Sequence, residues 1–350
     1  MDPVLSEWLS LALRWAHIIT GIAWIGSSFY FMWLDSHLEP PEKPKDGVEG
    51  ELWMTHSGGF YVVEKMNLAP HEVPRTLHWF KWEAAWTWIT GFLLLIVVYY
   101  FGSASFLIDP EVADISHTQA IVISLVLFIV AWAVYDGMYR SPLRHTGAWA
   151  EIVGIILLCL AIWGLTQVFS GRGAYVHVGA MIGTIMVANV WMIIIPGQRK
   201  LVEATKAGTP LDARLAFNAK QRSVHNNYLT LPVVFIMMSS HYSGTYGHEY
   251  NWLILIAMFA VGAVARHWFN LRNAGSKAVW PVPVAVIGFV ALAYLASPYF
   301  ASTGTASVDA DAEPVTFAQA YEILVNRCVS CHTEKPTDEN FDKAPKNVMF

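Results

Sequence analysis

Long runs of apolar residues, separated by short polar connections, dominate the chain. A helix that crosses a bilayer needs about 20 such residues. Tryptophan and tyrosine gather near the ends of the runs, as expected of anchors at a membrane–water interface. The pattern predicts an all-α, polytopic membrane bundle of about eight transmembrane helices, over residues 7–34, 79–102, 118–138, 148–169, 174–196, 226–243, 250–270 and 279–300.

The composition favours the same class of protein. Of the 350 residues, 55% are hydrophobic and 14% are charged, whereas about 25% charged residues is usual for a soluble domain. The net charge of −5 gives no reason to expect a nucleic-acid partner. We therefore expect the partner of this surface to be the lipid membrane.

Positive charge falls on alternate connections between the runs. The even-numbered connections hold only Arg172. Because cytoplasmic loops are rich in Lys and Arg, the odd-numbered connections should be cytoplasmic, and both termini should then lie outside, in the periplasm of a bacterial inner membrane. The basic residues of the odd connections are Lys43, Lys45, Lys65, Arg75, Arg140, Arg144, Arg199, Lys200, Lys206, Arg214, Lys220, Arg222, Arg266, Arg272 and Lys277.

A Cys-x-x-Cys-His sequence near the C-terminus is the most specific chemical signal. Cys328, Cys331 and His332 match the attachment pattern of c-type haem. The two thiols bond to the haem, and the imidazole becomes an axial ligand of its iron. The alternative is a zinc or redox Cys-x-x-Cys, but a zinc site needs two further ligands and no second pair is nearby. We expect covalent haem c, with His332 on its iron.

The motif also suggests a division into domains. Residues 1–300 are expected to form the transmembrane domain, with a long cytoplasmic loop at 35–78 that contains a short strand-like run. Small and polar residues at 301–315 are typical of a flexible linker. Residues 316–350 would be the start of a periplasmic cytochrome c domain. Only 18 residues follow His332, so we expect this domain to be incomplete and do not assign a second axial ligand.

Histidines within or beside the apolar runs are a second chemical signal, because ionisable groups at membrane depth are costly. His17 and His177 should lie at similar depth toward the outer side and could ligate one haem b. His78 and His225 should lie together near the inner side, where they could hold a second haem or line a substrate pocket. The alternative is that these histidines only form hydrogen bonds between helices.

Further polar residues gather at the inner helix ends. Arg75, Lys81, Arg222 and Asn226 are among them. Basic side chains at these positions also follow from topology alone. Glu83 is less expected at the start of an apolar run. Together with the two inner histidines, these groups would suit a flat, anionic, hydrogen-bonding heterocycle.

Three segments of the chain resemble the membrane-bound, cytochrome-c-linked urate oxidase (urate hydroxylase) family. They are residues 14–26, 78–83 and 225–232, and the order of helices and terminal Cys-x-x-Cys-His motif is similar too. The resemblance implies that urate is oxidised and hydrated to 5-hydroxyisourate in purine catabolism. It also implies that electrons pass through haem c to a downstream soluble cytochrome c or terminal oxidase instead of directly to O₂.

The resemblance gives roles to the polar residues named above. His78, His225 and Glu83 are then the catalytic candidates, with one of the histidines assisting removal of a proton from urate. The candidates for binding urate are Arg75, Lys81, Arg222 and Asn226. The alternatives are a respiratory haem subunit with another substrate, a membrane anchor that conducts electrons for a partner, and a haem-dependent porphyrinogen oxidase.

Overall fold

The computed structural model describes residues 2–146, 148–297, 316–329, 331–337, 343–344 and 348–350. The chain divides into two compact units, Met1–Ala296 and Ser297–Phe350. The predicted linker at residues 301–315 lies outside the described residues.

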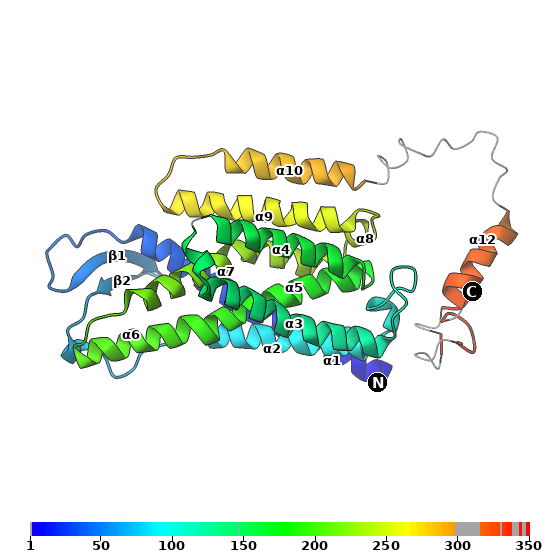
Figure 1. Ribbon diagram of the computed structural model, residues 1–350, viewed down its shortest axis with the longest axis horizontal. Helices are drawn as coiled ribbons and strands as arrows, with labels where there is room; N and C mark the ends of the chain where they lie inside the picture. The colour runs from blue at the N-terminus through cyan, green and yellow to red at the C-terminus, as the bar shows by residue number, and fades with distance from the viewer. Residues whose placement is uncertain (1, 147, 298–315, 330, 338–342, 345–347) are drawn as a thin grey trace. The chain divides into compact units, whose positions relative to one another are not determined.

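The first unit is mostly helical (Figure 1). Its helices are α1 (Pro3–His37), α2 (Trp82–Leu95), α3 (His117–Arg140), α4 (Trp149–Thr166), α5 (Gly171–Ala188), α6 (Ile195–Ala207), α7 (Ala213–Ser239), α8 (Ser243–Tyr246), α9 (Asn251–Asn273) and α10 (Pro281–Leu295). Two π-helical segments extend this set, with η2 (Ile96–Tyr100) continuing α2 and η5 (Asn189–Ile194) joining α5 to α6.

Six spans within the described residues are long and apolar enough to cross a membrane. They are α1, α2 with η2, α3, α4, α5 through α6, and α9. Helix α10 is apolar but has only 15 residues, and α7 has a polar first half. The all-α, membrane-compatible class is therefore confirmed in its main part, whereas the eight crossings stay a prediction.

The long helices of the first unit lie side by side along one axis (Figure 1). Strands β1 (Val48–His56) and β2 (Gly59–Met66) and helix α6 lie at one end of this bundle. We call it the hairpin end. The start of α1 and the short α8 lie at the other, which we call the N-terminal end. Sites along the bundle can thus be placed by their distance from either end.

The strands form an antiparallel hairpin within the segment predicted as a loop, so the all-α assignment is wrong for residues 48–66. Ser57 and Gly58, at the turn, have φ of 51° and 77°. Two successive positive φ angles are what a two-residue hairpin turn of type I′ requires. Lys45 joins the strands by donating to Glu51 (2.9 Å) and Glu64 (2.5 Å).

Helix α5 is the most enclosed part of the bundle. Tyr175 and Val178 are fully buried. A Cβ atom added to Gly179 would lie 2.6 Å from Cγ2 of Ile236, so α7 packs directly on the glycine. Small residues permit such close helix contacts in membrane bundles, which explains why α5 can sit among its neighbours.

The second unit is small. Helix α12 (Phe317–Leu324) begins with a capping box, in which the Thr316 hydroxyl and the Gln319 side chain each bond to the other's backbone N–H. The π-helical η6 (Val325–Val329) continues it into the Cys-x-x-Cys-His motif. The backbone N–H of His332 donates to the Cys328 carbonyl over 2.8 Å, which folds the motif into a turn.

Candidate functional site

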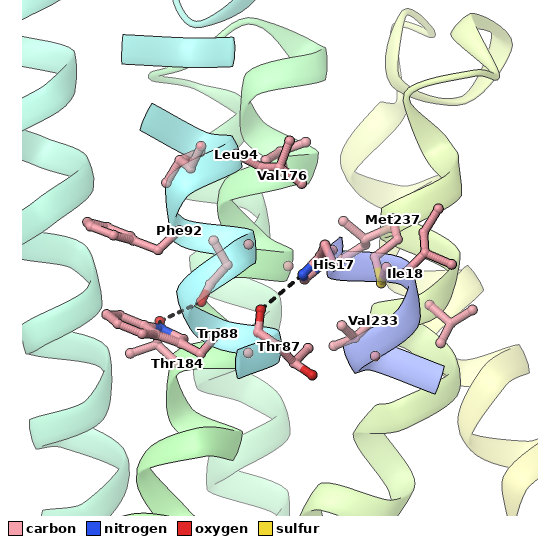
Figure 2. Close-up of a pocket in the computed structure, with 18 of the residues that line it drawn as sticks. His17, Ile18, Thr87, Trp88, Phe92, Leu94, Val176, Thr184, Val233 and Met237 are labelled. Atoms are coloured by element: carbon pink, nitrogen blue, oxygen red, sulfur yellow. Dashed lines mark hydrogen bonds between the residues drawn. The ribbon is translucent and has the colours of Figure 1, made fainter. Parts of the chain in front are cut away.

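A cavity of about 450 Å³ lies within the bundle, between α1, α2, α5 and α7 (Figure 2). We call it the mid-bundle cavity. Most of its lining is apolar, and its charged or ionisable side chains are Arg14, His17, Tyr99, Arg172 and His241. Ligand pockets usually have this character, with a few polar groups in an apolar wall.

His17 is held by hydrogen bonds to α2. Its Nδ1 donates to the Thr87 carbonyl oxygen over 3.0 Å (Figure 2) and lies 3.1 Å from the Thr90 hydroxyl. The ring rests on Gly91, where a Cβ atom would come within 2.8 Å of the imidazole Cε1. Because a carbonyl can only accept, Nδ1 carries the proton and Nε2 keeps its lone pair. Metal-ligating histidines use this arrangement.

Glycines make part of the cavity wall open and flat. Gly21 of α1 and Gly183 of α5 both line it. A Cβ atom on Gly183 would meet nothing within 4 Å, and one on Gly21 would reach only Thr87, at 4.0 Å. Beside them, the indole N–H of Trp88 donates to the Thr184 hydroxyl over 3.0 Å (Figure 2). The cavity can therefore admit a broad, flat group close to the helix backbones.

His177 is not part of this lining. Its ring stacks on Phe169 at 4.4 Å and on Phe128 at 6.2 Å. Nδ1 donates to the Gly173 carbonyl over 2.7 Å, while the buried Nε2 has no hydrogen-bond partner in the described part of the chain. The structure does not place His17 and His177 in the lining of one cavity. Their pairing on one haem stays a prediction.

A second cavity, of about 580 Å³, lies toward the hairpin end between α1, α6, α7 and the segment before α2. We call it the hairpin-end cavity. It brings together two residues predicted for the site, His78 and Asn226, and adds Gln198 and Ser223. Aromatic rings of Phe31, Trp79 and Phe80 also line it. The cavity thus combines amides, hydroxyls and an imidazole with rings on which a flat molecule could stack.

The two cavities adjoin. Trp24 and Ile25 of α1, Met186 of α5 and Thr230 of α7 line both. One layer of side chains therefore separates a pocket near the hairpin end from one deeper in the bundle.

A chain of hydrogen bonds connects Asn226 with His225. The Asn226 amide donates to the Met186 carbonyl (2.9 Å) and accepts from the Asn189 amide (2.9 Å). Asn189 also donates to the Tyr135 hydroxyl (3.1 Å), which bonds to Nδ1 of His225 (2.8 Å). His225 does not line the hairpin-end cavity but reaches it through this network.

Arg222 forms an ion pair away from the cavity. It is 3% exposed, and its guanidinium donates to the Asp136 carboxylate over 2.9 Å. It also lies over the rings of Tyr135 (4.5 Å) and Tyr139 (4.9 Å). The geometry makes Arg222 a support for the network around His225, and its predicted contact with substrate stays untested.

We expect Asp136→Leu to destabilise the protein by about 3–5 kcal/mol, because the buried Arg222 guanidinium loses the carboxylate with which it pairs. The double variant Asp136→Leu/Arg222→Leu should recover most of this loss. Asp35→Ala, which removes an exposed pair with Lys65, should cost under about 1 kcal/mol. Thermal unfolding in detergent measures all three, and equal stability of the Asp136 and Asp35 variants would contradict the assignment.

Three more predicted residues line neither cavity. Arg75 is exposed. The Lys81 ammonium lies 4.9 Å from the centre of the Trp191 ring, whose N–H donates to the Lys81 carbonyl. Glu83 has a buried carboxylate oxygen without a hydrogen-bond partner among the described residues. Their roles as substrate-binding or catalytic groups stay predictions.

Sequence reasoning missed Gln198, Tyr135 and Asn189. One signal was present for Asn189, which is a lone amide inside an apolar run, where polar groups are expensive. It also begins the π-helical segment η5, shortly before Pro196. Such segments are frequent at functional sites.

The Cys-x-x-Cys-His motif has a geometry that fits haem attachment. The side chains of Cys328 and Cys331 are half-buried. Nδ1 of His332 donates to the Val348 carbonyl over 2.8 Å, which leaves Nε2 to ligate iron. The residues present therefore suit the expected group.

Comparison with known proteins bears on the first unit. No curated protein and no solved structure matches the chain. The family model described as Urate oxidase N-terminal matches residues 3–297, which include both cavities and every transmembrane candidate. The chain therefore belongs to the Urate oxidase N-terminal family.

Proposed function

We propose that the protein oxidises urate to 5-hydroxyisourate in the hairpin-end cavity and passes the electrons to haem c on the C-terminal unit. Membership of the family indicates a urate-related oxidoreductase. The observation that carries the finer proposal is the meeting of His78, Asn226 and Gln198 with aromatic rings in one cavity.

The cavity suits urate chemically. Urate is flat and anionic, and it presents N–H donors and carbonyl acceptors around its edge. Asn226 and Gln198 can pair with such an edge because each amide offers a donor and an acceptor. Asn226 keeps capacity for this, since its bonds to Met186 and Asn189 use one amide hydrogen and one lone pair. Trp79 and Phe80 provide surfaces for stacking.

The reaction removes two electrons and two protons from urate and adds one water molecule at C5. A base near the ring is needed to take up a proton. His78 is the ionisable side chain that lines the hairpin-end cavity among the described residues, and it is exposed, so it can release that proton to water. The Asn226–Asn189–Tyr135–His225 network would hold Asn226 in place while the ring reacts.

The C-terminal motif would provide the electron exit. Cys328 and Cys331 would hold haem c, and His332 would ligate its iron through Nε2. When bound, haem c supplies a one-electron acceptor, so each urate needs two transfers. From there a soluble cytochrome c or a terminal oxidase would take the electrons.

We propose a bacterial inner membrane as the location, with the hairpin end in the cytosol and the C-terminal unit in the periplasm. Basic residues lie at the proposed cytosolic side, with Arg140 at the end of α3 and Arg199 and Lys200 on α6. Apolar side chains along α10, such as Ile287 and Val290, are more than half exposed, which suits contact with lipid. Urate arises in the cytosol and would reach the cavity from that side.

The proposal predicts that O₂ does not accept the electrons from urate. Purified protein with ferric cytochrome c should convert urate and reduce two cytochromes per urate, and it should form no hydrogen peroxide. Without an electron acceptor, turnover should stop even in air. Peroxide equal to the urate consumed would contradict the proposal. Absence of any urate turnover would instead favour an electron-conducting subunit for another substrate.

A further inference from the structure

We infer, building on the proposed urate reaction, that the mid-bundle cavity binds a b-type haem, with His17 and His241 as its axial ligands and Arg14 and Arg172 at its carboxylates. The cavity volume of about 450 Å³ is within the usual range for cofactor pockets. Four features of its lining support this choice.

The first feature is the orientation of His17. Its Nδ1 is committed to the Thr87 carbonyl, so Nε2 is free of its proton and can bind iron. The ring is fixed against Gly91 and cannot rotate without losing this hydrogen bond. An imidazole that only linked two helices would need neither a cavity beside its ring nor a glycine, here Gly91, in contact with the ring.

The second feature is the flat wall. Gly21 of α1 and Gly183 of α5 line the cavity, and neither is covered by another side chain. A porphyrin needs a broad surface without projecting side chains. The open space in front of Gly183 is available for such a ring, because a Cβ atom there would touch nothing within 4 Å.

The third feature is uncompensated positive charge. Arg14 and Arg172 line the cavity, and none of the described residues that line it is acidic. Nε of Arg172 is buried without a hydrogen-bond partner in the described part of the chain. Arginine pairs with carboxylates through its planar fork of donors. The two propionates of a haem would supply the missing anions.

The fourth feature is the second imidazole. His241 lines the same cavity, from just beyond the end of α7. His177 does not line it and is enclosed between Phe169 and Phe128. The pairing of His17 with His241 therefore replaces the pairing of His17 with His177 that equal depth in the sequence had suggested.

The position of the cavity gives the haem a use. It adjoins the hairpin-end cavity through Trp24 and Met186. Electrons taken from urate must cross a hydrocarbon layer of about 30 Å to reach haem c. A ferric haem b would accept one electron from urate and the resulting ferrous haem would give it to ferric haem c, twice for each urate.

The test measures haem directly and does not depend on urate. The full-length protein is purified, reduced with dithionite and extracted with acidified acetone, which removes non-covalent haem and leaves haem c. We expect about one extractable haem b per chain. His17→Ala should lose at least nine-tenths of it and keep haem c, whereas His177→Ala should keep both. His241→Ala should keep haem b but change its spectrum to a five-coordinate form.

A second pair of variants covers the case in which His17→Ala fails to fold. Gly183→Leu fills the cavity and should exclude haem b. Gly164→Leu is the matched control, because Gly164 on α4 also faces open space but lies outside the cavity. Wild-type protein that turns over urate without extractable haem would overturn the inference while leaving the proposed function standing. An unchanged haem b spectrum in His17→Ala or in His241→Ala would overturn the assigned ligands.

Discussion

Replacing His78 with alanine is expected to lower kcat for urate by about 10²–10⁴-fold, the usual contribution of a general base. His78 is the ionisable side chain of the hairpin-end cavity among the described residues, so no neighbour in that lining can take its place. Because Asn226 and Gln198 still bind the ring, KM should change much less than kcat. Steady-state rates of cytochrome c reduction at several urate concentrations measure both constants.

His71 provides the matched control for this variant. It lies on the same connection before α2 and is exposed, but it does not line the cavity. His71→Ala should keep kcat within about twofold of wild type. A His78→Ala enzyme with full activity would rule out His78 as the base and leave His225 and Glu83 as the remaining candidates.

Replacing both Cys328 and Cys331 with serine is expected to abolish electron transfer from urate to external cytochrome c. The thiols are the covalent attachment points of haem c, and serine cannot form the thioether bonds. The transmembrane unit makes its own core and should remain folded, because the two units are compact separately. Cytochrome c reduction and the content of covalent haem measure the effect.

Cys159→Ser is the control for this double variant. Cys159 lies on α4, in the apolar part of the bundle, and belongs to no motif. This variant should keep covalent haem and full electron transfer. Normal rates of cytochrome c reduction in the Cys328→Ser/Cys331→Ser protein would show that electrons leave the bundle by another route.

Most of the long helices could be predicted, because long apolar runs are typical of membrane-spanning helices. The hairpin at residues 48–66 was harder. Its residues gave only a short strand-like run, and its pairing depends on a turn with positive φ at Ser57, a residue that seldom adopts this conformation. The start of helix α7 could not be predicted from the apolar run at residues 226–243, because the helix begins earlier, at Ala213.

The direction in which each candidate side chain points could not be predicted from the sequence. The apolar runs predict that His17 and His177 lie toward the outer side of the bundle. Which way each side chain points depends on how the helices are rotated against one another, and a step of one residue turns the direction by about 100°. His17 lines a cavity, and His177 faces Phe169 and Phe128 instead.

At the hairpin end, only part of the cavity lining could be predicted from the sequence. His78 and Asn226 meet in one cavity, as their positions at neighbouring helix ends suggested. Gln198 joins them only because η5 and α6 continue α5 without a break. The apolar pattern predicts a helix end at residue 196, whereas α6 continues to Ala207. The continuous helix brings Gln198 into the lining of the cavity.

The most direct test of the central claim, that electrons from urate reach haem c through this protein, is an anaerobic reduction. Urate is added to the oxidised full-length protein without oxygen or soluble cytochrome, and the haem absorption bands are followed. We expect the c-type haem to become reduced, with two haem equivalents reduced per urate consumed. Haem that stays oxidised with urate but is reduced by dithionite would contradict the account.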